Sequence, residues 1–262
     1  MKKVSVIMPC YNDGEYVREA VTSVFAQTYK NIELIIIDDG SDRPTKEVLE
    51  QISKETNCVL LESGHKGPSE ARNIGISEAS GTYILPLDSD DIILPEYIEK
   101  AVHVMETNPE IGVVYCRAEL FGEEEGTWSL PDYSFERMLV GNIVFVTALF
   151  RKADWEAVGG FKTNMEHGLE DYDFWLSILE TNKTIYQLPE ILFRYRKKKD
   201  SRTTRMYKDK NVRDAYASIY ENHKRFYRNN WNLVLKGLVK RCLDIDFVKK
   251  KLSNILIFGN HI

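Results

Sequence analysis

The stretch that decides the fold spans residues 32–42 and reads Ile32-Glu33-Leu34-Ile35-Ile36-Ile37-Asp38-Asp39-Gly40-Ser41-Asp42. Residues 32–37 are dominated by isoleucine and predict a central parallel strand, because such a strand is covered on both faces. The polar residues that follow predict a turn into a helix over 44–55, with Ser41 or Asp42 as its N-cap. A buried strand that ends in two carboxylates is the first indication of function.

The same strand–helix alternation extends on both sides of this stretch. Short apolar runs predict strands over 4–8, 58–61, 83–87 and 112–116, and helical spacing predicts helices over 14–27, 68–79 and 95–107. This order predicts an α/β fold with a mostly parallel, doubly wound sheet, which binds ligands at the carboxyl ends of its strands. Further along we expect a loop over 122–131, a strand over 143–150 and a helix over 171–181. Helices are expected from about Ser201 onward, so the predicted domains are 1–204 and a C-terminal helical extension, 205–262.

Composition restricts the partners and the compartment. The 262 residues carry a formal net charge of -5, which argues against a nucleic-acid partner. Cys10, Cys58, Cys116 and Cys242 form no CxxC pair, which favours free thiols in a reducing compartment over a structural zinc site. The apolar start has no cleavage site, and no apolar run approaches the roughly 18 residues of a membrane span. We therefore expect a cytoplasmic protein, with peripheral attachment to the inner face of the membrane as an alternative.

An acidic cluster, Leu87-Asp88-Ser89-Asp90-Asp91, follows the predicted strand 83–87. Asp88 and Asp90 can converge on a hard divalent cation such as Mg²⁺ or Mn²⁺, which favours oxygen ligands. The alternative is a solvated turn that caps the helix beginning near Pro95. Taken alone, the cap is the better-supported interpretation, because two aspartates at this spacing are common by chance.

Residues at two further strand ends could bind a nucleoside. A carboxylate at Asp38-Asp39 could accept the N3–H of uracil, which cytosine lacks, and Tyr11 could stack on the base; the alternatives are a simple turn and a packing aromatic. Arg72 falls in the first turns of the helix over 68–79, where the helix dipole disfavours a cation. Its position indicates either an anion or carboxylate in the crevice, or a structural salt bridge to Asp38 or Asp39.

Glu170-Asp171 begins the predicted helix that contains Trp175. Carboxylates are stabilised at helix N-termini, so one interpretation is a charged cap. The other is a general base that removes a proton from an attacking hydroxyl.

Together these stretches resemble the family-2 glycosyltransferases, which have the GT-A fold. The resemblance covers roughly the first two hundred residues, and its strength lies in the number, order and spacing of motifs that are weak singly. The matching segments are Val4 to Asn12, Gln27-Thr28-Tyr29, Glu33 to Asp42, Gly67 with Ala71 to Gly75, Leu87 to Asp91, Gly159-Gly160-Phe161 and Glu170 to Asp173.

The resemblance implies a role for each matching position. Pro9, Tyr11, Asp39, Arg72 and Ser89 would bind the nucleotide sugar, with Asp39 on the uracil edge. Asp88 and Asp90 would hold Mn²⁺ or Mg²⁺ and the donor diphosphate, Asp90 being the more direct ligand. Asp171 would be the catalytic base, with Glu170 beside it. The implied reaction moves a hexose or N-acetylhexosamine from a UDP-sugar, with inversion, to a hydroxyl of a glycan or lipid-linked glycan in bacterial polysaccharide or glycoconjugate synthesis.

One departure from the family concerns the basic run near residue 196. Many members carry a histidine in a tract like Arg-x-His-x-x-Ser, where this chain has Arg196, which can bind phosphate but cannot ligate a metal. We hypothesise that a loop over 196–205 closes over the diphosphate. The alternatives are a solvated basic loop and a contact with anionic lipid or a lipid-diphosphate acceptor.

The apolar stripe of the C-terminal helices, from Tyr216 to Val239, is expected to pack on the catalytic domain; a homodimer interface or a membrane contact are the alternatives. Two other functions compete with glycosyl transfer. A nucleotidyltransferase would show a Gly-rich basic loop after the first strand, where this chain has Tyr11-Asn12-Asp13-Gly14. A non-catalytic sugar or nucleotide binder would need no base such as Asp171.

Overall fold

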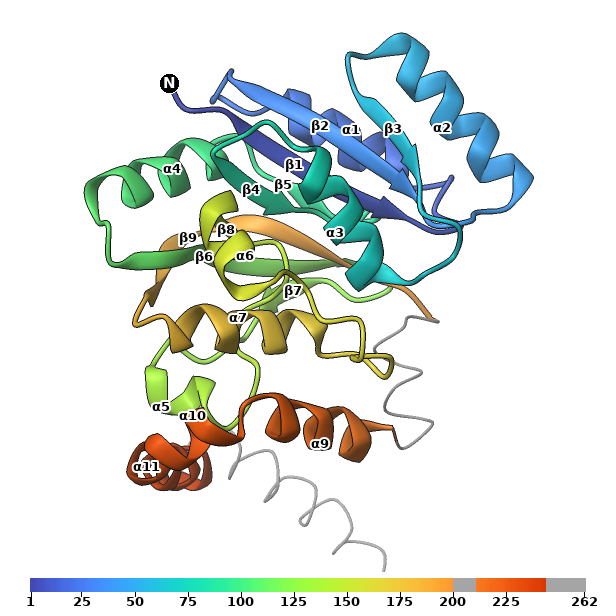
Figure 1. The fold of residues 1–262 in the computed structure, drawn as a ribbon. Helices are drawn as coiled ribbons and strands as arrows, with labels where there is room; N and C mark the ends of the chain where they lie inside the picture. Colours follow the sequence, from blue (N-terminus) through green and yellow to red (C-terminus); the bar gives the residue numbers. More distant parts are fainter. Residues whose placement is uncertain (200–210, 244–262) are drawn as a thin grey trace, which may run out of the picture.

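The computed structural model describes residues 1–199 and 211–243, which form an α/β fold around one mixed sheet (Figure 1). The nine strands of the described residues follow the order β3-β2-β1-β4-β8-β6-β9-β5, and β7 pairs with β6. The strands are β1 (Val4–Cys10), β2 (Ile32–Asp38), β3 (Val59–Glu62), β4 (Tyr83–Pro86), β5 (Ile92–Ile93), β6 (Ile111–Gly122), β7 (Gly126–Trp128), β8 (Leu149–Arg151) and β9 (Thr184–Lys197).

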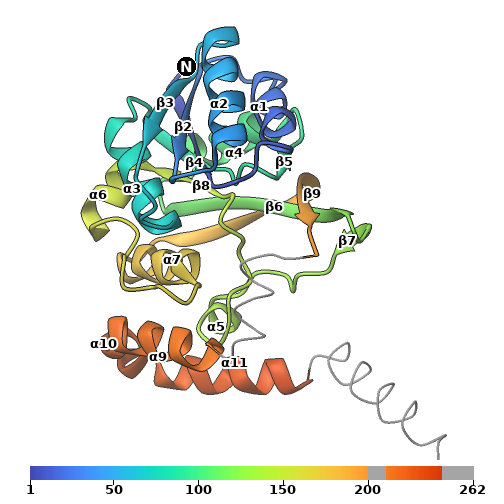
Figure 2. The ribbon, with the colours of Figure 1, turned by 90° about the vertical axis from the view of Figure 1, so that its right-hand side faces the viewer.

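The first half of the sheet is the predicted parallel, doubly wound unit. Strands β3, β2, β1 and β4 pair in parallel. The helices α1 (Val17–Phe25) and α2 (Arg43–Glu55) cover one face, and α3 (Pro68–Glu78) covers the other (Figure 2). Right-handed crossovers produce this arrangement, because the chain moves outward from β1 to β3 and then returns past β1 to β4. The topological switch therefore lies between β1 and β4, where such folds bind ligands.

Local sequence explains these elements. The side chains of Ile36 and Ile37 in β2 are fully buried, as the isoleucine run predicts. Asp42 is the N-cap of α2, since its carboxylate accepts a hydrogen bond from Thr45 N at 2.9 Å, which confirms one of the two expected caps. Gly75 lets α3 approach the sheet closely, because a Cβ there would lie 2.5 Å from Ile37 Cδ1.

The second half of the sheet mixes strand directions. Strand β8 is antiparallel to both β4 and β6, whereas β6 and β9 form a long parallel pair with bulges. The helices of this half are α4 (Tyr97–Thr107), α5 (Phe135–Met138), α6 (Lys152–Val158) and α7 (Glu170–Glu180). Aromatic side chains fill the space between α7 and the sheet, with Phe150, Phe161 and Phe174 in mutual ring contact.

Helices also form the described part of the C-terminal segment: α9 (Val212–Asn222), α10 (Lys224–Asn229) and α11 (Trp231–Leu243). Helix α9 packs against α7, and α11 packs against α5 (Figure 1). The expected packing of the apolar stripe is confirmed only in part, because several of its members are exposed: Tyr216, Tyr220, Trp231, Leu235, Leu238 and Val239. The proposed boundary near residue 205 lies outside the described residues. Among the helices of the described ranges, none is long and apolar enough to cross a membrane. All four cysteines are free, and Cys10 and Cys116 are buried.

Several predicted boundaries are wrong. Of the expected strand 143–150, only Leu149 and Phe150 pair as part of a strand, β8. Residues 143–148, all buried except the half-buried Val146, instead form an irregular segment that satisfies the same apolar pattern. The helix expected from Gly14 begins at Val17, after a turn closed on Asp13 O. The expected loop 122–131 contains β7. Strand β9 escaped prediction because Pro189 and several charged residues interrupt its alternation, and the structure accommodates them through bulges.

Candidate active site

The predicted acidic residues meet at the carboxyl edge of the parallel strands. Strands β2 and β4 flank β1, with Asp39 N bonded to Cys10 O at 2.8 Å and Leu87 N bonded to Ile7 O at 2.9 Å. The chain therefore leaves two neighbouring strands at the same edge, once into Asp39 and once into Asp88. This edge is also the topological switch of the fold.

Asp39 occupies a fixed position on one side of this edge. Its Oδ1 accepts from Ser63 Oγ at 2.5 Å and from Lys66 N at 2.8 Å, and its Oδ2 accepts from Gly67 N at 2.9 Å. Each carboxylate oxygen has two lone pairs, so Oδ2 retains capacity for one further donor. Asp38, by contrast, turns away to cap Ser41 N at 2.8 Å and to pair with Lys46.

An exposed aromatic pair stands beside Asp39. Tyr11, 47% exposed, contacts the ring of His65 with the centroids 4.7 Å apart. His65 has a left-handed backbone, with φ of 62°, which brings its ring over this edge and its Nδ1 within 3.3 Å of Asp39 O. The sequence indicated Tyr11 but not His65, which comes from the loop between β3 and α3. Pro9, the other residue of this predicted set, is half-buried in β1.

Arg72 joins the two acidic motifs. Its guanidinium is 3% exposed and donates from Nη2 to Asp88 Oδ1 at 2.7 Å and from Nη1 to Glu170 Oε1 at 2.9 Å. Arg72 therefore does form salt bridges within the protein, but the expected partners Asp38 and Asp39 are wrong; binding of a ligand anion by Arg72 stays a prediction. The first turns of α3 carry this cation because two acids from distant segments surround it.

A second cation, Lys198, lies in the acidic cluster itself. Its Nζ is 2.6 Å from Asp90 Oδ2 and 2.8 Å from Asp13 Oδ1, and Ser89 Oγ bonds the other oxygen of Asp13 at 2.9 Å. Burial raises the pKa of Asp90, and the nearby Asp88 and Asp13 add to this effect against the opposing influence of Lys198. Burial lowers the pKa of Lys198, but the charges and hydrogen bonds of Asp90 and Asp13 together outweigh this, so the net shift is upward and the ammonium is retained. Asp13 was not predicted as a site residue, and Lys198 was predicted only as a member of the loop over 196–205.

The cluster is not the helix cap considered above. The N-cap of α4 is Glu96, it makes no side-chain cap bond, and β5 separates it from the aspartates. Asp91 is 1% exposed and accepts a hydrogen bond from Arg196 N at 2.8 Å, while burial raises its pKa well above the ordinary value. Hence Asp91 links the cluster to β9, whereas the side chains of Asp88 and Asp90 are partly exposed.

Arg196 belongs to strand β9, so the prediction of a loop that begins at this residue is wrong. Its Nε donates to Asp90 O at 2.8 Å and its Nη2 to Glu19 Oε2 at 2.7 Å, and its guanidinium lies over the rings of Tyr16 and Phe121. These four contacts fix the guanidinium of Arg196, which in turn stabilises the backbone of the acidic cluster at Asp90. Residues 200–205 of the hypothesised loop lie outside the described residues.

Glu170 and Asp171 begin α7, as the resemblance implies. The N-cap residue before them, Leu169, has a left-handed backbone with φ of 64°, a strained conformation for leucine that sets the direction of the helix start. Asp171 accepts from Asn142 Nδ2 at 3.0 Å and from Tyr172 N at 2.7 Å. Burial, together with the adjacent Glu170, raises the pKa of Asp171 to about 7, the range suited to a general base.

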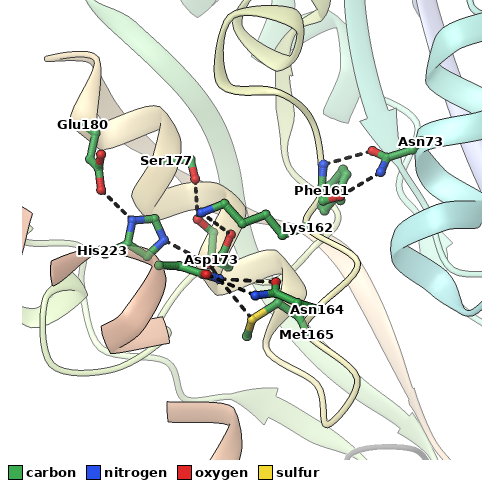
Figure 3. Close-up of polar contacts among 10 residues, drawn as sticks. Asn73, Phe161, Lys162, Asn164, Met165, Asp173, Ser177, Glu180 and His223 are labelled. Atoms are coloured by element: carbon green, nitrogen blue, oxygen red, sulfur yellow. Dashed lines mark hydrogen bonds and ion pairs between the residues drawn. The ribbon is translucent and has the colours of Figure 1, made fainter. Parts of the chain in front are cut away.

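A buried polar cluster holds the rest of α7 in place (Figure 3). Asp173, which is fully buried, accepts from His223 Nε2 at 3.1 Å and from Asn222 Nδ2 at 2.7 Å, and pairs with Lys162 at 3.4 Å. Burial raises the pKa of Asp173, but the bonds from His223 and Asn222 outweigh this, and the net shift is downward. Helix α7 thus shares one ionised group with the residues at the end of α9.

Asn73 fixes the turn at Gly159-Gly160-Phe161. It accepts from Phe161 N at 2.9 Å and donates to Phe161 O at 2.7 Å (Figure 3). It also accepts from Trp155 Nε1 at 3.1 Å. Because Asn73 is the neighbour of Arg72 in α3, one helix positions both the turn and the link between the acidic motifs.

The carboxylates offer the chemistry of a divalent-cation site. In the described ranges, no group of three or more His, Cys, Asp or Glu side chains is arranged to hold a metal ion. Mg²⁺ and Mn²⁺ nevertheless require few protein ligands when phosphate oxygens and water complete the shell. Asp88 and Asp90 supply hard oxygen donors, and Lys198 shows that this point of the site already holds a positive charge. The donor set therefore fits such an ion.

Two surface hollows lie elsewhere. They measure about 470 and 420 Å³ and run along α1, against α2 on one side and β5 on the other. None of the acidic site residues lines either hollow, so neither is a candidate for the chemistry described here.

A carboxylate fixed at the parallel sheet edge, an acidic cluster on the neighbouring strand and a pair of carboxylates at a helix start are the arrangement expected of a glycosyltransferase with the GT-A fold. The chain belongs to glycosyltransferase family 2: the sequence model of "Glycosyl transferase family 2" matches residues 5–164. An uncharacterised glycosyltransferase of Haemophilus influenzae is 33% identical over 198 residues, which are 72% of this chain and 66% of that protein.

Two solved structures show the same fold. Staphylococcus aureus TarS, in complex with UDP-GlcNAc, superposes with a TM-score of 0.66 at 21% identity, over 77% of this chain and 60% of that one. The mannosyltransferase PcManGT of Pyrobaculum calidifontis, in complex with GDP-Man and Mn²⁺, gives a TM-score of 0.64 at 17% identity, over 97% of this chain and 81% of that one. The chain thus spans about two thirds or less of the first relative and of TarS.

Proposed function

We propose that this chain transfers a hexose or N-acetylhexosamine from a nucleotide diphosphate sugar, a UDP-sugar first, to a hydroxyl acceptor with inversion of configuration. The single observation that carries the proposal is the ion-pair chain Asp88–Arg72–Glu170. It supports a common site for the acidic cluster and for the Glu170-Asp171 pair, which are distant in sequence. A pure binding protein would need only one of these motifs.

The donor base would lie against Tyr11 and His65. Their exposed rings offer a stacking surface, and the remaining lone pair of Asp39 Oδ2 is suited to the N3–H of uracil. In this proposal Asp39 accepts a hydrogen bond from the edge of the base, and Pro9 lines the site near the end of β1.

The diphosphate would lie over the acidic cluster. Asp88 and Asp90 would hold Mn²⁺ or Mg²⁺, which supplies positive charge to the departing diphosphate. Lys198 neutralises Asp90 and Asp13 in the donor-free chain and can turn toward a phosphate without leaving the cluster, because its ammonium presents three donors. This assigns to Lys198 the phosphate contact that the sequence suggested for Arg196.

Asp171 would take the proton of the attacking hydroxyl. Its pKa of about 7 allows it to accept that proton near neutral pH, and Asn142 holds its carboxylate in one orientation. A positioned general base typically contributes on the order of 10² to 10⁴-fold in rate. The acceptor, a glycan or a lipid-linked glycan, would approach from the side of the Gly159-Gly160 turn.

The proposal is tested by thermal stabilisation with UDP-, GDP- and dTDP-sugars, each with Mn²⁺, Mg²⁺ or a chelator. At a ligand concentration of 100 Kd, we expect about 2.7 kcal/mol of stabilisation, with UDP-sugars and only when the metal is present. Asp90→Asn should lose this effect, whereas Asp132→Asn, an exposed control, should keep it. Product anomers read by NMR then test inversion. Equal stabilisation with chelator would contradict the metal role, and a retained anomer would contradict inversion.

A further inference from the structure

Helix α11 exposes an apolar stripe to solvent. Trp231, Leu235, Leu238 and Val239 are 59%, 44%, 44% and 57% exposed. Their spacing places them on one side of the helix. The other side packs on α5 at Gly237, where the backbone of Glu136 leaves no room for a Cβ. Figure 2 shows α11 along the outer edge of the molecule, with α5 between it and the sheet. We call these four residues the α11 stripe.

The segment that carries the stripe is strongly basic. Residues 224–243 contain Lys224, Arg225, Arg228, Lys236, Lys240 and Arg241 and no acidic residue, in a chain whose net charge is -5. Lys224 pairs with Glu221, and Lys240 pairs with Glu136 at 3.1 Å. Arg225, Arg228 and Lys236 are exposed. An apolar stripe within a purely basic segment, with tryptophan at one end, is typical of helices that lie in a membrane interface.

The charge pattern decides between two occupants of the stripe. In a symmetric dimer the same surface faces itself, so the basic side chains of two α11 helices would approach each other without an acidic partner from this segment. A bilayer surface with anionic headgroups provides the opposite charge and accepts the apolar stripe at the same time. The pattern therefore favours lipid over a second copy.

We propose that the α10–α11 surface docks on a membrane leaflet that contains anionic lipids, with the α11 stripe inserted at the level of the headgroups. This goes beyond the proposed glycosyl transfer and does not depend on it. A protein docked in this way would work beside lipid-borne molecules while no helix in its described part crosses the bilayer.

The experiment is flotation of the full-length protein with vesicles of phosphatidylcholine, with and without phosphatidylglycerol. The protein should float only with phosphatidylglycerol, and binding should weaken when salt is raised from about 0.1 M to about 1 M, because the Debye length falls from roughly 10 to 3 Å. Lys236→Glu should lower the partition coefficient by on the order of ten-fold, since each basic residue near the surface contributes about a factor of five. The double variant Trp231→Ser/Leu235→Ser should abolish binding.

Matched variants at the opposite end of the fold control for charge and apolar area. Arg43→Glu and Phe25→Ser alter exposed side chains on α2 and α1, and both should float like the unmodified protein. Light scattering of every variant reports the oligomeric state, and circular dichroism reports folding. Equal flotation with neutral vesicles, flotation unchanged in the stripe variant, or a dimer that the stripe variant disrupts would each overturn the proposal.

Discussion

Replacing Arg72 by methionine would remove the cation that joins the two acidic motifs. Methionine has a similar length but no charge, so the buried carboxylate of Glu170 would lose its ion pair with Arg72. Breaking a buried pair in this way costs about 3–5 kcal/mol. The Asp88 contact adds little, because that side chain is 35% exposed and a partly solvated pair contributes about 1 kcal/mol or less. We therefore expect Arg72→Met to destabilise the protein by about 3–5 kcal/mol, which corresponds to a Tm lower by roughly 6–20 °C.

Urea unfolding followed by tryptophan fluorescence measures this loss, with Trp175, fully buried on α7, among the reporters. Arg43→Met, at a side chain 90% exposed, is the matched control and should change stability by less than about 0.5 kcal/mol. In the double variant Arg72→Met/Glu170→Gln the buried charge of Glu170 is removed as well, so stability should recover in part, with a coupling energy of about 1–3 kcal/mol. A loss below about 1 kcal/mol in the single variant, or no recovery in the double variant, would refute the reasoning.

The remaining predictions concern catalysis and packing. Asp171→Asn should abolish transfer while donor affinity, measured by calorimetry, stays within about two-fold; loss of affinity would contradict its role as base. Because the base must be ionised and its pKa is raised to about 7, kcat/KM should rise with pH through this value, and a profile flat from acid to neutral pH would count against Asp171. Lys198→Met should weaken donor binding about ten-fold or more by removing a charge-assisted contact, whereas Lys199→Met, at a side chain 85% exposed, should not. Gly75→Ala should lower the stability of the protein by about 1–3 kcal/mol in thermal melts, because the added Cβ would overlap with Ile37. An unchanged Tm would show that Ile37 can move to accommodate the methyl group.

Much of the first half of the fold was predictable because its signals are local. The isoleucine run of β2, the Asp42 cap and the acidic residues just past β2 and β4 follow from short-range rules of burial and turn chemistry. The same rules place Asp39 and Asp88 at one sheet edge once the strands are known to be parallel.

The rest depended on contacts that no local pattern reveals. The basic run near Arg196 was recognised, but which cation reaches the acidic cluster is decided by the bulged pairing of β9 with β6. That pairing sends Arg196 to the backbone of Asp90 and brings Lys198 to Asp13, 185 residues away. Arg72 was noticed for its unfavourable position on α3, yet its partner Glu170 is 98 residues away.

The buried aspartate of α7 has a consequence for biosynthesis. Asp173 receives its bond from His223, fifty positions later in the chain, and cannot be desolvated favourably before that residue is made. As the chain emerges from the ribosome, α7 should therefore not pack stably until α9 and His223 have been synthesised. A nascent chain that ends between Asp173 and His223 would expose the aromatic residues between α7 and the sheet, and would therefore be a target for chaperones.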